Sequence, residues 1–472
     1  MYFYIIYENM NIKYQVNKFI TVRLEENNTF IYLNNKRFIQ CKFLVINIPI
    51  EEINKLNNPN DIDHLIHEDG KLYESYPSDN LFFGEYDTKY RKVKDQIAPK
   101  EEFWAHCSNL QVWAEFNYDT RLLHSNLSFP LLKKLTELGD PIAKKVFKEE
   151  IAKRFRTEVG SVMKFLVLEG YLDQLNYEEL EVLVRDLKKM DLSQCDLQIF
   201  PKWILKAKKT EQLYLNNNMI CEIPNEIKSL KNIKVLDLSF NKLHTISESI
   251  GKLVNIENLI LSRNQIVELP DCFTNLKSLK TLGLSDNNII TLPKSIGDLT
   301  SLEIMNLSNN KLLEITNSIR NINNLKKLDL SLNKLNRFPE KICNILTLEQ
   351  LSLSNNDIVR IPNSISNLYN LKVLDLSENG IIEIPRYLGD LTSLKNLLLS
   401  GNKIEIIPDS LKNLLSLEFI HIDENNLLEF PKFLDKLPLL KEITIDKIQN
   451  NMLSNKLREE LKKKKIKIFL IS

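Results

Sequence analysis

Two histidine-containing pairs have the residue types and spacing that chemistry would need. His106 and Cys107 are adjacent and His124 follows in the same segment, so a histidine that takes the thiol proton would create a cysteine nucleophile. His64 and His67 are three residues apart, which places two imidazoles on one helix face, as in some metal sites. No further histidine or cysteine completes a ligand set, and nothing marks a lowered thiolate pKa. We therefore predict an ordinary loop and a buried structural pair, with no catalytic residue and no bound metal.

No nucleotide-binding motif is visible in the sequence. A phosphate-binding loop needs a glycine-rich turn that ends in Gly-Lys and Ser or Thr, and none of the 11 glycines lies in such a run. We therefore expect no cofactor and no GTPase or kinase domain. A net charge of +1 predicts no general attraction to nucleic acid, and no apolar run reaches the ~18 residues that suggest a membrane span.

The composition is that of an ordinary globular protein. The chain of 472 residues is 43% hydrophobic and 26% charged, which is enough for two or three domains. Its six cysteines are scattered without Cys-x-x-Cys pairs. Because paired cysteines are typical of secreted proteins, dispersed ones favour reduced thiols and a cytoplasmic location.

One sequence pattern recurs every 23 residues between Leu187 and Leu437. Its clearest marker is an asparagine, found at Asn218, Asn241, Asn264, Asn287, Asn310, Asn333, Asn356, Asn379, Asn402 and Asn425, with Cys195 one step earlier. In the fourth repeat Leu259 and Leu261 should point inward while Ile260 points outward. One such strand cannot bury its apolar side alone, so the repeats must stack. The asparagine amides are expected to satisfy backbone groups at each bend, because an amide both donates and accepts.

The pattern LxxLxLxxNxLxxLPxxIxxLxx resembles that of the leucine-rich-repeat family. The resemblance implies an α/β solenoid of eleven repeats over residues 187–439, with a curved parallel sheet and a short helical or irregular convex side. The pattern is similar to that of scaffold proteins that bind Ras-like small GTPases, which implies a small GTPase or its regulator as the partner. Together with the N-terminal segments it also resembles an archaeal leucine-rich-repeat architecture.

The flanking segments have compositions of their own. Residues 1–48 are predicted to form a small β-meander, and residues 49–100 a linker or loop. Residues 101–185 are predicted to be helical, with a start signal at Asp140 and Pro141, and to cap the exposed end of the first repeat. Residues 440–472 should close the other end with a helix and a short strand. The run from Lys462 to Lys465 is expected to be a solvated helix end, with an anionic membrane contact as the alternative.

The outward strand positions are the candidate binding residues. They are the third, fifth, seventh and eighth places of LxxLxLxxN, and the seventh is nearly always a serine, which we interpret as a neutral filler. The charged residues there are Lys189, Arg263 and Lys327 against Asp191, Asp237, Asp286, Asp329, Asp375, Glu378, Asp423 and Glu424. The excess of carboxylates predicts an acidic stripe.

Apolar residues interrupt this stripe in three consecutive repeats. Tyr214, Phe240 and Ile260 lie there with Arg263 beside Phe240. Neighbouring strands are ~4.8 Å apart, so the four side chains should form one patch of the residue types enriched in interface hot spots. The alternative is that Phe240 and Tyr214 simply pack against each other.

These features predict a non-enzymatic scaffold that binds a partner protein on its concave face. The expected partner surface is basic with an apolar knob. The predicted contact residues are Tyr214, Asp237, Phe240, Ile260, Arg263, Asp286, Asp329, Asp375 and Glu378. One alternative is a thiol-dependent enzyme similar to ubiquitin-ligase effectors, acting through the His106 region on a substrate held by the repeats. Another is an adaptor whose N-terminal β unit binds separately.

Overall fold

The computed structural model describes residues 12–38, 99–123 and 125–471. The predictions for His64, His67 and His124, and for the linker up to residue 98, lie outside these residues. The chain divides into two compact units, Met1–Lys153 and Arg154–Ser472.

The first unit contains a small antiparallel sheet of four strands in the order β1-β2-β3-β4. The strands are β1 (Ile12–Gln15), β2 (Ile20–Glu25), β3 (Asn28–Leu33) and β4 (Lys36–Arg37). Glu26 and Asn27 connect β2 to β3, and Asn34 and Asn35 connect β3 to β4, all four with positive φ. Two-residue turns with positive φ match the twist of a hairpin, and asparagine tolerates that conformation. The Asn-rich turns of the predicted meander are therefore the turns of the sheet.

Three helices complete the first unit: α4 (Pro99–Glu115), α5 (Ser125–Glu137) and α6 (Pro141–Phe155). Helix α4 packs against β2 and β3. Asp140 caps α6, because its Oδ1 accepts hydrogen bonds from the N–H groups of Ile142 (2.9 Å) and Ala143 (3.1 Å). Its Oδ2 accepts one from the Tyr118 hydroxyl at 2.6 Å. The segment 101–185, predicted to be one cap, is thus divided: α4 belongs with the β unit.

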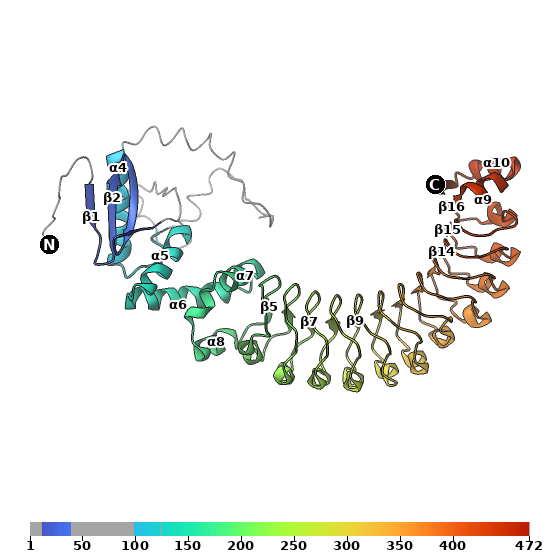
Figure 1. The fold of residues 1–472 in the computed structure, drawn as a ribbon, viewed down its shortest axis with the longest axis horizontal. Helices are drawn as coiled ribbons and strands as arrows, with labels where there is room; N and C mark the ends of the chain where they lie inside the picture. The colour runs from blue at the N-terminus through green and yellow to red at the C-terminus, as the bar shows by residue number, and fades with distance from the viewer. Residues whose placement is uncertain (1–11, 39–98, 124, 472) are drawn as a thin grey trace. The chain divides into compact units, whose positions relative to one another are not determined.

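The second unit is a solenoid with one parallel sheet of 13 strands, which confirms the predicted fold class. The strands are β5 (Lys189–Asp191), β6 (Gln212–Tyr214), β7 (Val235–Asp237), β8 (Asn258–Ile260), β9 (Thr281–Gly283), β10 (Ile304–Asn306), β11 (Lys327–Asp329), β12 (Gln350–Ser352), β13 (Val373–Asp375), β14 (Asn396–Leu398), β15 (Phe419–His421), β16 (Glu442–Asp446) and β17 (Lys467–Ile471). Within this unit the sheet lines the concave side (Figure 1). The eleven predicted repeats supply β5 to β15, and the C-terminal segment adds two strands.

Short 3-10 helices form the convex side of the solenoid (Figure 1). They are η2 (Lys202–Lys206), η3 (Asn225–Ser229), η4 (Glu248–Lys252), η5 (Asp271–Asn275), η6 (Ile296–Asp298), η7 (Asn317–Asn321), η8 (Glu340–Asn344), η9 (Asn363–Asn367), η10 (Arg386–Asp390), η11 (Asp409–Asn413) and η12 (Lys432–Lys436). Pro270, at φ −70°, directly precedes η5, because its fixed φ suits the start of a helical turn and it has no N–H to leave unpaired. Leu259, Leu261, Phe273 and Leu276 are fully buried, so strand and turn of each repeat enclose one continuous core.

The N-terminal end of the solenoid is covered by α7 (Gly160–Leu168), η1 (Tyr171–Gln174) and α8 (Tyr177–Val184). Both oxygens of Glu158 accept backbone hydrogen bonds at this end, from Lys188 (3.1 Å) and Lys189 (3.0 Å). In the next repeat the equivalent N–H groups bond to the Lys188 carbonyl. Glu158 therefore takes the place of the backbone acceptor that a preceding repeat would supply. Gly160 permits the close approach of α7, since a Cβ there would lie 2.5 Å from Asp191 Oδ2.

The C-terminal end consists of β16, α9 (Lys447–Met452), α10 (Asn455–Lys463) and β17. Strand β17 pairs with β16 in parallel and is the last strand of the sheet. Leu457 and Leu461 of α10 are buried, and Ser454 caps the helix by accepting from the Leu457 N–H. Lys462 and Lys463 lie in the last turn of α10, where cations interact favourably with the helix dipole.

Candidate functional site

The ten asparagines form a column that runs along the solenoid at the end of the strands. The Nδ2 of Asn241 donates to the carbonyls of Leu215 (2.9 Å) and Leu238 (3.1 Å), and its Oδ1 accepts from the Ile220 N–H (2.9 Å). The other nine amides make the corresponding bonds, and eight of the ten side chains are buried. Each asparagine thus joins backbone groups of two repeats. This column is structural and is not available to a partner.

Cys195 stands at the first place of this column. It accepts no inter-repeat bond, but its own N–H donates to Asn218 Oδ1 at 3.0 Å. Its side chain is buried and burial raises the pKa of the thiol to about 11. A small apolar side chain is tolerated here because there is no preceding repeat whose backbone groups need a partner.

Five of the nine serines at the seventh position donate their hydroxyl to a neighbouring side chain, so the interpretation as neutral filler was wrong for these five. Ser239 donates both its N–H and its hydroxyl to Asp237 Oδ1, at 2.9 and 2.6 Å. Ser331 bonds in the same way to Asp329. An aspartate that accepts from the backbone two residues ahead stabilises a turn. Asp237 and Asp329 therefore support the local fold and present only part of their carboxylate to a partner.

The eighth position has left-handed backbone in every repeat. It is occupied by Gln194, Asn217, Phe240, Arg263, Asp286, Asn309, Leu332, Asn355, Glu378, Gly401 and Glu424, with φ between 52° and 64°. Asparagine and glycine adopt this conformation at little cost, whereas bulky side chains do not. Phe240 and Leu332 are the apolar exceptions, and they are 44% and 49% exposed. Their presence gains no core packing.

Four consecutive side chains at this position contact one another. The Arg263 guanidinium lies over the Phe240 ring, 4.7 Å from its centroid. Its Nε is 3.8 Å from Asp286 Oδ2, and Asn309 Nδ2 donates to Asp286 Oδ1 at 2.7 Å. We call Phe240, Arg263, Asp286 and Asn309 the arginine row. It is a chain of exposed groups across four repeats.

Tyr214 and Ile260 lie in a different row, at the fifth position, with Asp237 between them in the register. The Lys189 Nζ is 5.6 Å from the centre of the Tyr214 ring. Beyond Ile260 is Gly283, which is buried. The Ile260 side chain and the Ser262 hydroxyl cover it, since a Cβ there would lie 3.3 Å from Ile260 Cδ1 and 3.2 Å from Ser262 Oγ. The predicted single patch is therefore two rows, because the fifth position is in the strand and the eighth is in the following loop. In the described structure the two aromatic rings have separate cationic neighbours.

The carboxylates of the concave face are concentrated in the later repeats. In the first seven repeats Lys189, Arg263 and Lys327 accompany four carboxylates, whereas in the last three repeats four carboxylates occupy these positions without any lysine or arginine. Those carboxylates are Asp375, Glu378, Asp423 and Glu424. Asp423 is buried and accepts a hydrogen bond from the Ser400 hydroxyl at 2.7 Å, so only the other three are presented to a partner. The predicted acidic stripe is thus an acidic region at the C-terminal part of the array, and the arginine row lies in its N-terminal part.

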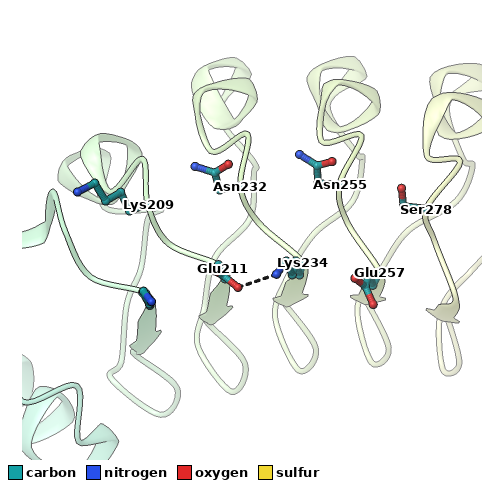
Figure 2. Close-up of a pocket in the computed structure, with 8 residues that line it drawn as sticks. Lys209, Glu211, Asn232, Lys234, Asn255, Glu257 and Ser278 are labelled. Carbon is teal, nitrogen blue, oxygen red and sulfur yellow. Dashed lines mark hydrogen bonds and ion pairs between the residues drawn. The ribbon is translucent and has the colours of Figure 1, made fainter.

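A ladder of alternating glutamate and lysine side chains lies just before the strands, and the sequence analysis missed it. Glutamate and lysine alternate at the second position, as Lys188, Glu211, Lys234, Glu257, Lys280, Glu303, Lys326, Glu349 and Lys372. Figure 2 shows Glu211 and Lys234 pointing toward each other across adjacent strands, at 2.8 Å. Asn232 and Asn255 in the same view donate to backbone carbonyls of the preceding repeat. A sign that alternates every 23 residues was the signal that could have revealed this ladder.

The paired carboxylates of this ladder titrate below their usual range. A hydrogen bond from Lys280 holds the pKa of Glu257 below its ordinary value, and Lys326 does the same for Glu303. Both pairs have 2.7 Å separations and are exposed to solvent. Exposed pairs contribute little to stability, so we interpret the ladder as a guide to repeat register.

His106 and Cys107 are both buried in α4. Burial raises the pKa of the Cys107 thiol to about 12, whereas a nucleophilic cysteine needs a lowered pKa. Burial also lowers the pKa of His106, against the opposing effect of Glu102, whose Oε1 is 3.5 Å from the imidazole. The neutral thiol and neutral imidazole give no support to thiol catalysis here.

Among the described residues, no group of three His, Cys, Asp or Glu side chains is arranged to hold a metal ion. Within the same residues, every helix is too short or too polar to cross a bilayer.

Known proteins resemble this chain in sequence and in fold. Models described as leucine-rich repeat or leucine-rich repeat region match residues 232–253, 269–312 and 328–469. A leucine-rich-repeat protein of Leptospira interrogans is 30% identical, with a TM-score of 0.57, over 62% of this chain and 80% of that one. No curated protein matches the chain significantly.

Two further structures share part of the array. The plant peptide hormone receptor RGFR1, solved in complex with RGF2, is 28% identical with a TM-score of 0.51, over 57% of this chain and 45% of the receptor. TLR13, solved in complex with ssRNA13, is 28% identical with a TM-score of 0.50, over 58% of this chain and 41% of that one. The asparagine column, the 23-residue register and the Leptospira relative together show that this chain belongs to the leucine-rich-repeat family.

Proposed function

We propose that this chain is a non-enzymatic scaffold that binds another protein on the concave face of its array. Leucine-rich repeats typically mediate protein interactions, and the sheet here presents an open face of 13 strands. The observation that supports the proposal most directly is Phe240, a half-exposed aromatic ring in left-handed backbone with Arg263 over it. Unfavourable backbone at a side chain outside the buried core is typical of functional positions.

The charges of the concave face favour a basic partner surface. Asp375, Glu378 and Glu424 form a region without a compensating cation at the same positions. An apolar side chain of the partner would contact Phe240 and Ile260. Excess carboxylates repel a phosphate backbone, so binding of nucleic acid, as seen in the TLR13 complex, is not proposed for this chain.

A small GTPase or its regulator is the first candidate partner. The 23-residue pattern resembles that of Ras-binding scaffolds, which supports this choice at the level of the family, although fold alone does not fix function. A cytoplasmic location fits the same proposal. The five described cysteines are free thiols, and reduced thiols are usual in that compartment. The archaeal type of N-terminal extension stays a prediction.

The test is a comparison of captured partners between matched variants. Phe240→Asn and Arg263→Ala should each abolish recovery of the specific partner from a lysate of the source cells. Leu332→Asn is the control, because Leu332 has the same backbone conformation and similar exposure but lies outside the arginine row. A purified Ras-like GTPase, loaded with GDP or a GTP analogue, tests the finer proposal. Equal recovery by all three variants would refute the arginine row as a binding site.

The Phe240→Asn substitution should also raise the free energy of unfolding of the array. Asparagine adopts left-handed backbone more readily than phenylalanine, so Phe240→Asn is expected to stabilise the array by about 0.5–1 kcal/mol. Urea unfolding followed by circular dichroism measures the change. A variant that is more stable but no longer binds would show that Phe240 is kept for recognition. A destabilised variant would instead assign Phe240 to the fold.

A further inference from the structure

Strand β17 is the last described strand of the sheet, and no described strand pairs with its outer side. In each preceding strand the residue at the sixth position donates its N–H to the next strand: Leu215 donates to the Asp237 carbonyl (2.8 Å) and Ile422 to that of Thr444 (3.1 Å). Leu470 holds this position in β17, because it is paired in register with Ile445. No described strand lies beyond β17. The Leu470 N–H is therefore directed at the place where a fourteenth strand would lie.

The two ends of the solenoid differ in this respect. At β5 the free backbone groups are satisfied by Glu158 and covered by α7. At β17 the described residues include no side chain that bonds to the outer edge. Proteins usually cover or interrupt the edges of their sheets, because an uncovered edge is a template for another strand.

The apolar core also continues to this edge. Ile422 and Ile445 are fully buried, whereas Leu470 at the equivalent position is 50% exposed. Phe469 and Ile471 point to the other side of the strand and are 48% and 40% exposed. An added strand with alternating apolar side chains would cover Leu470 as each repeat covers the one before it.

The C-terminal segment that ends in β17 is strongly basic in sequence. Residues 446–471 contain eight lysines and arginines against three carboxylates. Lys456, Lys462, Lys465 and Lys467 are exposed, and no carboxylate of the described residues is within ion-pair distance of them. A second copy of the chain would bring its own lysines to the same place, so this charge opposes self-association and favours an acidic strand.

We propose that β17 is a docking edge that accepts an extended acidic segment of another protein as an additional strand. Backbone hydrogen bonds to the edge would provide affinity, and apolar and acidic side chains of the segment would provide selectivity. This site is separate from the concave face, so one chain would hold two partners at once.

A synthetic peptide of four Glu-Val units, labelled with fluorescein, is the probe, and anisotropy with the full chain measures its binding. Saturable binding is expected, and it should be lost when alternate peptide amides are N-methylated, because strand pairing needs those N–H groups. Equal binding of the methylated peptide, or no binding of the unmodified one, would overturn the proposal.

Leu470→Pro is the decisive variant. Proline removes the outward N–H but not the bonds to β16, and proline is tolerated at such edge positions. Peptide affinity should fall by about tenfold or more. Leu470→Ala, which keeps the N–H, should lose less affinity and serves as the control if the proline variant unfolds.

The charge requirement has its own matched pair of variants. Lys462→Glu with Lys467→Glu should weaken binding strongly, whereas Lys311→Glu with Lys334→Glu, an equal charge change far along the array, should not. Two outcomes would assign the edge to a different occupant and overturn the proposal. One is a dimer of the full chain in light scattering that Leu470→Pro abolishes. The other is binding to phosphatidylserine vesicles by a chain that does not bind the peptide.

Discussion

The two ends of each strand connect the repeats in different ways. After the strand, the asparagine column is buried and almost uniform, and each amide bonds to the backbone of two repeats. Before the strand, the glutamate–lysine ladder is exposed, and its groups bond only to one another. The alternation of glutamate and lysine breaks once, because Lys372 is followed in the next repeat by Lys395. After this break Glu418 pairs with both Lys395 and Lys441. The asparagine side chains bond to buried backbone groups, so the residue type at that position is almost uniform from repeat to repeat. The glutamate and lysine side chains are solvated, so the residue type at their position can differ between repeats.

The largest expected effect is that of breaking the buried column. In Asn310→Leu the Ile289 N–H and the carbonyls of Leu284 and Leu307 lose their partner inside the protein. The array should lose about 3 kcal/mol or more of its free energy of unfolding. Urea denaturation measures the loss. Asn324→Ala is the control, because Asn324 also bonds to the preceding repeat, at Thr300, but is exposed. Equal losses would show that burial does not separate the two kinds of contact.

A smaller effect is expected where a side chain replaces backbone at a partly exposed end. Glu158→Ala removes the acceptor of the Lys188 and Lys189 N–H groups and should cost about 1–2 kcal/mol. Hydrogen exchange at these two amides should become faster while amides in the central repeats are unchanged. Glu158→Gln retains one oxygen and should give an intermediate rate. Unchanged exchange in the alanine variant would refute the role of Glu158 as an end cap.

His106 differs from the buried asparagines because its buried Nδ1 has no hydrogen-bond partner. Burial lowers its pKa below the ordinary 6.5, so the folded state favours the neutral imidazole. The associated stability is fully present above pH ~6.5 and is lost as the pH falls through the lowered folded pKa. In a Trp203→Phe background, Trp104 and Trp113 report thermal unfolding of α4. Its midpoint should decrease from pH 7.5 to 5.5, and His106→Leu should remove most of this dependence. An equal decrease in both would assign the effect to other groups.

The smallest effect is expected in the exposed ladder. Glu303→Lys places three lysines, at 280, 303 and 326, on adjacent strands, and should lower the melting temperature slightly. Raising the salt concentration should reduce the difference, because exposed charges are screened. The double variant with Lys326→Glu restores one pair and should recover part of the loss. A large, salt-independent loss would mean that the ladder contributes to stability as the buried column does.

The concave face shows how far residue positions could be predicted. Spacing alone identified Phe240 and Arg263 as neighbours, because a constant 23-residue step aligns equivalent positions of adjacent strands. It placed Tyr214 in the same patch, since sequence does not reveal that the eighth position is in a left-handed loop beside the strand. The hydrogen bonds from Ser239 to Asp237 were missed for the same reason.

The sequence by itself determined the solenoid, its register and its buried amides, because these depend on contacts between identical positions of adjacent repeats. Only the tertiary structure decided what lies at the ends. Helix α4 packs on the β unit, Glu158 completes the first strand, and β17 adds the last described strand to the sheet. These contacts join segments that have no common period, so no spacing in the sequence could indicate them.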